Sequence, residues 1–265
     1  MPMRPPQALT DPAARALYHR MTCVPWHFIR SAAATGSENM AHDEALLQQA
    51  IAEQIPPTLR LYTWAPPAVS LGHFQTADAI DLEYARSRGW DIVRRPTGGR
   101  AVLHHLELTY CVVLPPSVVD GAGVRTSYSV LVGALNAGLA PLLQDVALSS
   151  PAEAPVCDAR SNRAANCFAL ASECDTVIPD GKLVGSAQVR RAGALLQHGS
   201  ILLDAEPAAW AALFGTSGRL VTLRQLLGRP VSASEVGVAI RQGFSSVGVS
   251  WINASSPSPA GECDP

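Results

Sequence analysis

Apolar side chains recur every three or four positions in several parts of the chain, which is the spacing of one face of an α-helix. The stretch from Ser37 to about Gln54 shows this most fully: its apolar residues share a face, a serine can cap its start, and a Pro-Pro pair follows its end. The same criteria predict further helices over 13–20, over 78–88 before Gly89, from Ser127 to a break near Pro141, and after the capping sequence Ser232–Glu235.

Strand signals alternate with these helices. Leu108–Leu114 is β-branched and apolar enough to be buried on both faces of a sheet, and a shorter strand is expected over Asp91–Val93. Residues 175–178 and 183–190 are predicted to form a hairpin, because the Pro-Asp-Gly sequence at 179–181 between them favours a turn. The pattern therefore predicts an α/β fold in which helices cover a mixed or antiparallel sheet.

Composition divides the chain into a middle and two ends. With 265 residues, 48% of them hydrophobic, the chain is long enough to bury a sizeable core, and one main domain is the simplest division. Residues 1–25 are rich in proline and arginine and are expected to be an N-terminal extension. Residues 26–252 form the expected domain, and residues 253–265, with their Ser-Pro sequence, are expected to be a disordered tail.

Charge and cysteine usage exclude several classes of function. The net charge of −2 provides no basic field for nucleic acid, so we expect a protein partner or a small substrate. The six cysteines are irregularly spaced and contain no CxxC pair, which disfavours a structural zinc site. No signal peptide is visible and no apolar run reaches the roughly 18 residues that span a bilayer. We therefore expect a cytoplasmic protein with free thiols, no membrane segment and no metal or other cofactor.

One cysteine has a candidate partner. Cys167 and Lys182 are fifteen positions apart and are embedded among small residues and turn formers. A thiol attacks as the thiolate, and a nearby ammonium group raises the thiolate fraction at neutral pH. The pair is therefore a candidate activated nucleophile. Taken singly, Cys167 also fits an inert buried thiol and Lys182 a solvated surface lysine.

The segment from Arg94 to His105 contains two adjacent glycines between arginines. The glycines remove side chains where a ligand has to pass close to the backbone, and the arginines are suited to an anionic or phosphorylated carrier group. A tight loop with surface arginines is the alternative. The order of residues fits neither the P-loop nor the dinucleotide-binding glycine motif, which disfavours phosphate binding of those kinds.

Five motifs in a fixed order resemble the lipoate–biotin protein ligase superfamily. Within it the chain is most similar to the cysteine-dependent octanoyltransferases that resemble lipoate–protein ligase A. The similarity runs from about Trp26 to Trp251, with His105 and Cys174 as departures from the usual acidic and aromatic residues. The motifs are Arg-Arg-x-Thr-Gly-Gly-Arg-Ala-Val-x-His at 94–104, Glu-Leu-Thr-Tyr at 107–110, Asn-Cys-Phe at 166–168, Gly-Lys-x-Val-Gly-Ser-Ala-Gln at 181–188, and Gln-His-Gly-Ser-Ile-Leu-Leu at 197–203.

This resemblance implies a fold, a pair of catalytic residues and a substrate tunnel. The implied fold is the α/β catalytic domain shared with biotin ligases and class II synthetases. Cys167 is implied to form an acyl-thioester, and Lys182 to lower the pKa of its thiol. The residues implied to line the acyl tunnel are Arg95, Thr97, Gly98, Gly99, Arg100, Ala101, His104, Gly185, Ser186, Ala187, Gln188, His198, Gly199 and Ser200.

The implied reaction is transfer of an octanoyl chain from acyl carrier protein, through Cys167, to a lysine of a lipoyl domain or of the glycine cleavage H protein. We expect the protein to act as a monomer. One alternative is an ATP-dependent lipoate or biotin ligase, in which Lys182 contacts an acyl-adenylate and Cys167 is incidental. A non-catalytic protein that binds the acyl carrier is another. For His198 and His104, orienting a carbonyl or phosphate and a purely structural role both remain open.

Overall fold

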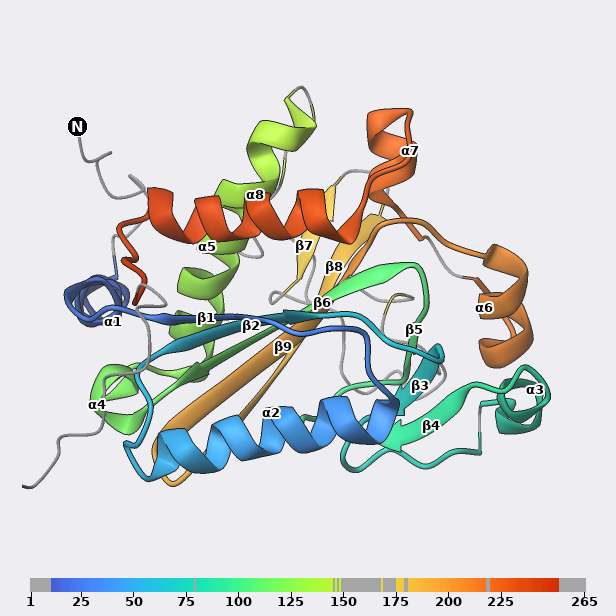
Figure 1. Cartoon of the computed structure of the whole chain (residues 1–265), viewed down its shortest axis with the longest axis horizontal. Helices are drawn as coiled ribbons and strands as arrows, with labels where there is room; N and C mark the ends of the chain where they lie inside the picture. The colour runs from blue at the N-terminus through green and yellow to red at the C-terminus, as the bar shows by residue number, and fades with distance from the viewer. Residues whose placement is uncertain are drawn as a thin grey trace, which may run out of the picture.

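The computed structural model describes residues 11–78, 80–144, 146, 148, 168, 175–178, 181–217 and 220–252. Within them, six strands form the main sheet in the order β1-β2-β6-β9-β8-β7, and three form a smaller sheet in the order β4-β3-β5 (Figure 1). In the main sheet β1 is parallel to β2, and the other neighbours are antiparallel. The strands are β1 (His27–Arg30), β2 (Thr58–Tyr62), β3 (Ala68–Leu71), β4 (Asp91–Arg94), β5 (Val102–His104), β6 (Glu107–Leu114), β7 (Thr176–Ile178), β8 (Gly181–Arg191) and β9 (Ala194–Leu202).

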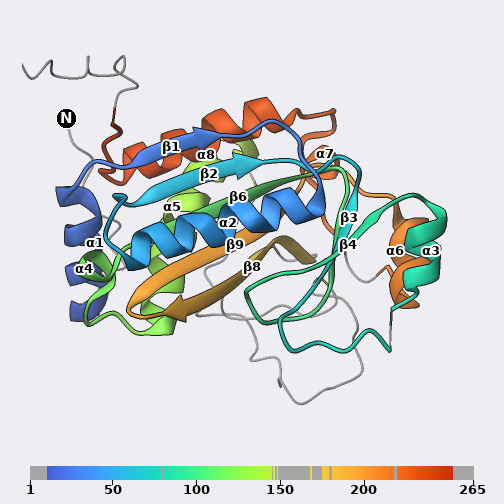
Figure 2. The same ribbon diagram turned by 60° about the horizontal axis from the view of Figure 1, so that its bottom comes forward.

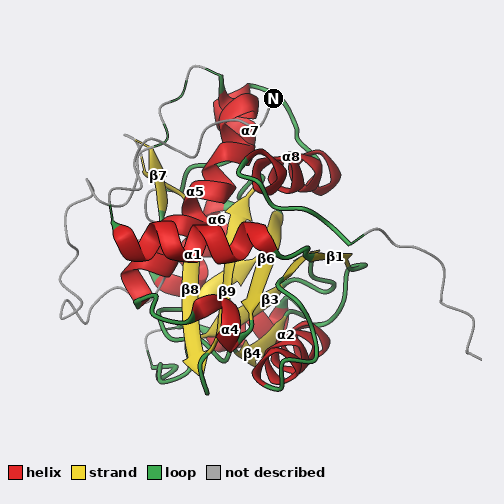
Figure 3. Cartoon of the chain, turned by 90° about the vertical axis from the view of Figure 1, so that its left-hand side faces the viewer, coloured by secondary structure: helices red, strands yellow, loops and turns green. Residues whose placement is uncertain are grey.

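Helices lie on both faces of the main sheet. Figure 2 shows α2 across one face and α5 with α8 behind the other, and Figure 3 shows the strands between these two layers. The expected mixed sheet covered by helices is confirmed. The helices are α1 (Pro12–Cys23), α2 (Gly36–Ile51), α3 (Leu82–Ser87), α4 (Pro116–Val119), α5 (Val124–Leu143), α6 (Pro207–Phe214), α7 (Leu223–Leu227) and α8 (Ala233–Ser246).

Strand β6 lies inside the main sheet and is buried along its whole length, as its continuous apolar sequence predicts. Successive side chains of a strand point to opposite faces. Leu108 and Val112 belong to the large core beneath α5 and α8, whereas Cys111 and Val113 belong to the core beneath α2. Polar Thr109, which shares a face with Cys111, therefore points to the α2 side of the sheet.

The helix starts differ from the predicted ones because other residues cap them. Thr35, not Ser37, caps α2: its hydroxyl accepts from the Glu38 backbone N–H, and the Glu38 carboxylate accepts from the Thr35 N–H. This capping box begins the helix two residues earlier than a cap at Ser37 would. The second predicted helix is shorter than expected, since the Asp81 carboxylate caps it and α3 covers only Leu82–Ser87. Gly89 follows it with φ +67°.

Two further helix boundaries also differ in detail. Helix α5 begins at Val124 rather than Ser127, and Pro141 is accommodated in its last turn, so the helix continues to Leu143. At α8, the Ser232 hydroxyl accepts from the Glu235 N–H as predicted. The Glu235 carboxylate, however, pairs with Arg229, so the cap acts in one direction only.

The N-terminal helix is part of the main core. Leu17 and Met21 of α1 are buried against the large cluster beneath α5 and α8. The predicted short helix at 13–20 is thus present and longer, and the stretch expected to be an extension contributes to packing. Trp26 donates to Ser250 and accepts from Ile252, which joins the first strand to the end of the described chain. The limits of the domain stay a prediction.

Among the described helices, α5 is long and apolar enough to cross a membrane by length and composition alone, although no such segment was expected from the sequence. Half of its apolar window is buried inside the fold. Its buried residues include Leu131, Leu135 and Leu139, which repeat at helical spacing and belong to the main core. This stripe gives the apolar sequence of α5 a packing role.

Helices α5 and α8 approach each other at glycines, which provides a stability test. A methyl group on Gly138 would lie 2.5 Å from the Ala239 carbonyl oxygen and 2.9 Å from the Ile240 Cα. Both contacts are with backbone, so Gly138→Ala is expected to lower the free energy of unfolding by about 1–3 kcal/mol. Exposed Gly133 in the same helix has no atom within 4 Å of that position. Gly133→Ala is therefore expected to stabilise by up to about 1 kcal/mol through helix propensity. Urea denaturation of both variants measures the difference, and equal effects would contradict this packing.

Candidate active site

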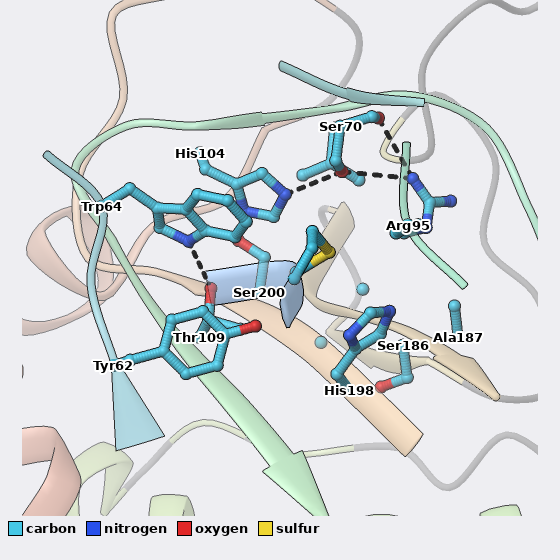
Figure 4. A pocket seen from close by; sticks show the side chains of 14 residues that line it. Tyr62, Trp64, Ser70, Arg95, His104, Thr109, Ser186, Ala187, His198 and Ser200 are labelled. Carbon is cyan, nitrogen blue, oxygen red and sulfur yellow. Dashed lines mark hydrogen bonds between the residues drawn. The ribbon is translucent and has the colours of Figure 1, made fainter. Parts of the chain in front are cut away.

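A pocket of about 370 Å³, including its open mouth, lies between the α2 face of the main sheet and the smaller sheet. Figure 4 shows Trp64 and His104 stacked on one side of it, with His198, Ser186 and Ala187 on the other. The lining residues come from α2, from both sheets and from the loops that join them. They are Met40, Tyr62, Trp64, Ser70, Arg95, Val102, His104, Thr109, Gly185, Ser186, Ala187, His198, Gly199 and Ser200.

The register of the main sheet brings several of these residues together. Thr109 of β6 pairs with Ser200 of β9, and Ser200 pairs in turn with Gly185 of β8. Paired residues project from the same face of a sheet. These three positions therefore form a row across the floor of the pocket. The glycine in the row lets the Lys182 and Phe168 side chains pack closely over the sheet, 3.1–3.3 Å from where a Cβ would lie.

The glycine loop is built around a buried arginine. Arg95 is 4% exposed and donates to the carbonyls of Ser70, Gly98 and Arg100 and to the Thr97 hydroxyl. The neighbouring Arg94 donates to the carbonyls of the 72–75 loop. Both guanidinium groups thus hold loop backbone in place. This geometry favours the tight-loop interpretation of the segment for these two arginines.

Close backbone contact explains the glycines of this loop. Gly99 has φ +90°, a conformation that side chains rarely adopt. A Cβ atom on Gly72 would lie 1.9 Å from the Gly99 carbonyl oxygen, so the two loops touch through their main chains. His73 donates its N–H to the Thr97 carbonyl across the same contact. The loop around Arg95 is consequently held in place by main-chain contacts.

A chain of buried hydrogen bonds runs beneath the pocket from Asp43 to Thr97. His198 Nδ1 lies 3.0 Å from the Asp43 carboxylate and Nε2 lies 2.7 Å from the Thr97 hydroxyl. Because the carboxylate only accepts, Nδ1 carries a proton, and Nε2 pairs with the Thr97 hydroxyl, which is able to donate or accept. The Tyr62 hydroxyl and Arg60 also donate to Asp43. Both nitrogens of His198 are satisfied, which favours a structural role for this histidine.

The same groups determine the charge state of Asp43, which is fully buried. Burial by itself would raise the pKa of this carboxyl group. The hydrogen bond and charge of His198, with contributions from Arg60 and Tyr62, outweigh that effect and lower the pKa below its ordinary value. Asp43 is therefore a carboxylate at neutral pH, and it orients His198. The sequence carried a signal for it, since 43 falls on the apolar face of α2 with Met40 and Leu47.

One side of the pocket is a stacked and hydrogen-bonded polar cluster. The rings of Trp64 and His104 stack with centroids 4.0 Å apart. His104 Nε2 contacts Ser70 at 2.8 Å and Nδ1 contacts Glu107 at 3.3 Å. Burial lowers the pKa of His104, and Arg95 and His198 act in the same direction against the opposing effect of Glu107. His104 is therefore neutral at pH 7 and forms part of the pocket wall.

Lys182 forms a buried ion pair beside the pocket wall. Its Nζ lies 2.8 Å from Asp175 Oδ2, and the two side chains are 3% and 0% exposed. Asp175 Oδ1 accepts from the backbone N–H of Ser186, which fixes the carboxylate to β8. The Lys182 Nζ lies 5.3 Å from the centre of the Phe168 ring, and both side chains pack over Gly185. Asp175 was not predicted as a site residue, and its place at the start of a hairpin provides no sequence signal.

The structure brings eight of the fourteen predicted tunnel residues to the pocket, whereas Cys167 lies outside the described residues. Thr97 lies one hydrogen bond behind His198, and Gly98, Gly99 and Arg100 form the loop around Arg95. Ala101 is buried in the core of the smaller sheet. Gln188 bonds to Gln197 and to Ser127 of α5, on the opposite face. Val102 lies within the predicted stretch from Arg95 to His104, and the lining residues that were not predicted to line the tunnel are Met40, Tyr62, Trp64, Ser70 and Thr109.

The surface that the pocket exposes is mostly apolar. Across the part of the chain that the structure describes, no group of three or more histidine, cysteine or acidic residues is arranged to hold a metal ion. The polar side chains of the wall are mostly engaged with one another. The ion pair of Lys182 with Asp175 lies beside the pocket, because the Lys182 Cε is 3.1 Å from the Cβ position of the lining residue Gly185. A buried ammonium group at that position can stabilise an anionic reacting atom.

Comparison with known proteins agrees with this geometry. An octanoyltransferase LipM from Kyrpidia tusciae is 42% identical over 83% of this chain and 85% of its own. A second octanoyltransferase LipM, from Symbiobacterium thermophilum, is 40% identical over the same shares. A structure of lipoate-protein ligase A bound with ATP superimposes with a TM-score of 0.67 at 22% identity, covering 86% of this chain and 88% of that one, which shows a shared fold.

The family model of the lipoyl protein ligase A/B catalytic domain matches residues 35–245, which include every described pocket residue. The match and the two relatives confirm the resemblance that the five motifs indicated. The protein therefore belongs to the lipoyl protein ligase A/B catalytic-domain family.

Proposed function

We propose that the protein is an octanoyltransferase of lipoate biosynthesis, which moves an octanoyl chain from acyl carrier protein to a protein lysine through a thioester on Cys167. The observation that carries the proposal is the similarity to two octanoyltransferases, at 40% and 42% identity over 83% of this chain. The pocket supports it, because Gly185, one of its lining residues, lies against the side chain of the buried Lys182.

The reaction proceeds in two exchanges at sulfur. The Cys167 thiolate attacks the carbonyl carbon of the octanoyl thioester, the bond to the carrier sulfur breaks, and the carrier leaves as its thiol after taking a proton. The amine of the acceptor lysine then attacks the new thioester, an amide forms and the Cys167 thiol is restored. The first exchange is nearly balanced, and the second is downhill because an amide is more stable than a thioester. No nucleotide has to drive it.

Two groups of residues have roles in this scheme. Lys182 favours the thiolate of Cys167, and the order of the chain supports this, since Cys167 directly precedes Phe168, whose ring lies 5.3 Å from the Lys182 Nζ. The pocket holds the acyl chain, with each buried methylene contributing about 0.8 kcal/mol. Backbone N–H groups of the glycine-bearing segments are suited to the developing oxyanion, an effect of about 3 kcal/mol per donor.

The acceptor in this proposal is a lipoyl domain or the glycine cleavage H protein. A structural relative supports this class of partner. It comes from a structural analysis of a bipartite lipoate protein ligase and its E2 lipoyl domain from Thermoplasma acidophilum. That protein superimposes with a TM-score of 0.64 at 22% identity over 86% of both chains. We further propose that the present protein acts as a monomer in the cytoplasm.

An assay without nucleotide tests the function. Octanoyl carrier protein and a lipoyl domain are mixed with the protein, and mass spectrometry of the lipoyl domain follows its octanoylation. Transfer is expected without ATP and is expected to be unchanged when ATP is added. The competing function is that of a ligase, which is an alternative because an ATP-bound ligase shares this fold. A ligase is expected to transfer nothing without ATP. Transfer that requires free acid and ATP, with lipoate-dependent ATP–pyrophosphate exchange, would replace our proposal.

A further inference from the structure

The single lysine of the chain is held by a carboxylate. Lys182 is the only lysine among the 20 lysine and arginine residues, so every other permanent cation of the protein is a guanidinium group. Its Nζ lies 2.8 Å from Asp175 Oδ2, and neither side chain is more than 3% exposed. A second bond, from the Ser186 N–H to Asp175 Oδ1, holds the carboxylate against β8. The pair is thus rigid as well as buried.

The charge of Asp175 does not itself favour a thiolate. A negative charge 2.8 Å from the ammonium group cancels much of the field that would stabilise a thiolate nearby. An isolated Lys182 would be the stronger activator while it remained charged. Burial, however, disfavours the charged form of a lysine, and at 3% exposure solvent contributes little to keeping the proton. The carboxylate reverses that preference and stabilises the ammonium form.

The protonation state of Lys182 matters because a neutral amine beside the pocket is able to react with an acyl thioester. The Lys182 Cε lies 3.1 Å from the position of a Cβ on Gly185, and Gly185 lines the acyl pocket. An unprotonated Lys182 would be the same nucleophile as the acceptor lysine of the proposed reaction. It would attack the acyl thioester, form an octanoyl amide on its own nitrogen and release the thiol. No oxidant or nucleotide is required, and the amide is not a substrate for further transfer.

We propose that Asp175 is a positioning residue that keeps Lys182 as an ammonium group and so prevents the enzyme from acylating itself. Lys182 is then a latent N-acylation site, with acyl thioesters as the reagent. Arginine at the other cationic positions is inert to such reagents. This inference rests on the proposed octanoyltransferase function, and it adds protection against self-acylation to the support that Asp175 gives to the Lys182 ammonium group.

The test is Asp175→Asn, which keeps an oxygen acceptor for the Ser186 N–H and removes the charge. Wild-type and variant protein are incubated with octanoyl carrier protein, treated with hydroxylamine to cleave thioesters, and mapped by peptide mass spectrometry. The wild type is expected to lose its octanoyl group completely. The variant is expected to accumulate a hydroxylamine-resistant octanoyl group on Lys182, and its transfer activity is expected to fall in proportion to the modified fraction.

Two further variants separate the possible causes. Lys182→Arg in the Asp175→Asn background restores a cation that cannot be acylated, so the resistant adduct is expected to disappear. Glu206→Gln, at an exposed ion pair with Arg88, serves as a charge control and is expected to leave Lys182 unmodified. An Asp175→Asn protein that forms the Cys167 thioester normally and leaves Lys182 unmodified over repeated turnovers would overturn the inference. Absence of any thioester in the wild type would instead overturn the proposed function.

Discussion

Replacing Cys167 by serine is expected to reduce octanoyl transfer by at least ~10³-fold, the scale on which loss of a covalent nucleophile acts in enzymes. A serine hydroxyl is not ionised at neutral pH, and the Lys182 ammonium group cannot stabilise an alkoxide enough to ionise it. The pseudo-first-order rate of lipoyl-domain octanoylation, measured at saturating octanoyl carrier protein, gives the ratio. The fold is expected to be unchanged, with the same midpoint in urea as the wild type.

Cys23 provides the matched control for this substitution. It is an exposed thiol on α1, in the part of the chain that packs away from the pocket. Cys23→Ser is expected to transfer the acyl chain at the wild-type rate. A Cys167→Ser protein that retains more than a tenth of the activity would show that another group carries the acyl chain.

Replacing Asp43 by alanine is expected to cost about 3–5 kcal/mol of unfolding free energy, because the buried Arg60 guanidinium would lose its charged partner. The Arg60 side chain is 2% exposed and that of Asp43 is fully buried, with Nη1 and Oδ1 2.7 Å apart. Urea denaturation at pH 7 measures the loss. Glu206→Ala, which breaks an ion pair exposed by 38% on each side, is expected to cost less than about 1 kcal/mol. Similar costs for the two variants would contradict the buried network.

The pH dependence of the unfolding free energy also reports the contribution of Asp43. Because folding lowers the pKa of Asp43, this group contributes stability above its ordinary pKa of about 4 and loses it as the pH falls through the lower folded value. The isosteric Asp43→Asn variant lacks that contribution. The difference in unfolding free energy between wild type and Asp43→Asn is therefore expected to be largest near neutral pH and to shrink below about pH 4.

The elements with strong local signals were predictable from the sequence. The apolar run of β6, the hairpin of β7 and β8 and the apolar face of α2 are all present. The starts of α2, α3 and α5 were less predictable, because several residues at each start are able to cap and only tertiary packing selects among them. The competition between Thr35 and Ser37, two hydroxyl residues two positions apart, is one example.

The motifs identified the region of the pocket but not the hydrogen bonds and ion pairs around it. Gly185, His198 and Gly199 of the motifs line the pocket, because they lie on the paired strands β8 and β9. Asp43, Asp175 and Trp64 belong to other segments and meet the pocket only through sheet pairing and long-range hydrogen bonds. The arginines of the glycine loop were expected to be suited to an anion, and the structure shows that Arg94 and Arg95 hold backbone carbonyls instead.

The location of the acyl group after the first half-reaction decides whether Cys167 carries the octanoyl chain. The protein is mixed with octanoyl carrier protein in the absence of acceptor, quenched in acid and mapped by peptide mass spectrometry. We expect one octanoyl group, on the peptide that contains Cys167, and we expect hydroxylamine to remove it. An octanoyl group on another residue, or an unmodified protein that nevertheless transfers the chain to a lipoyl domain, would contradict it.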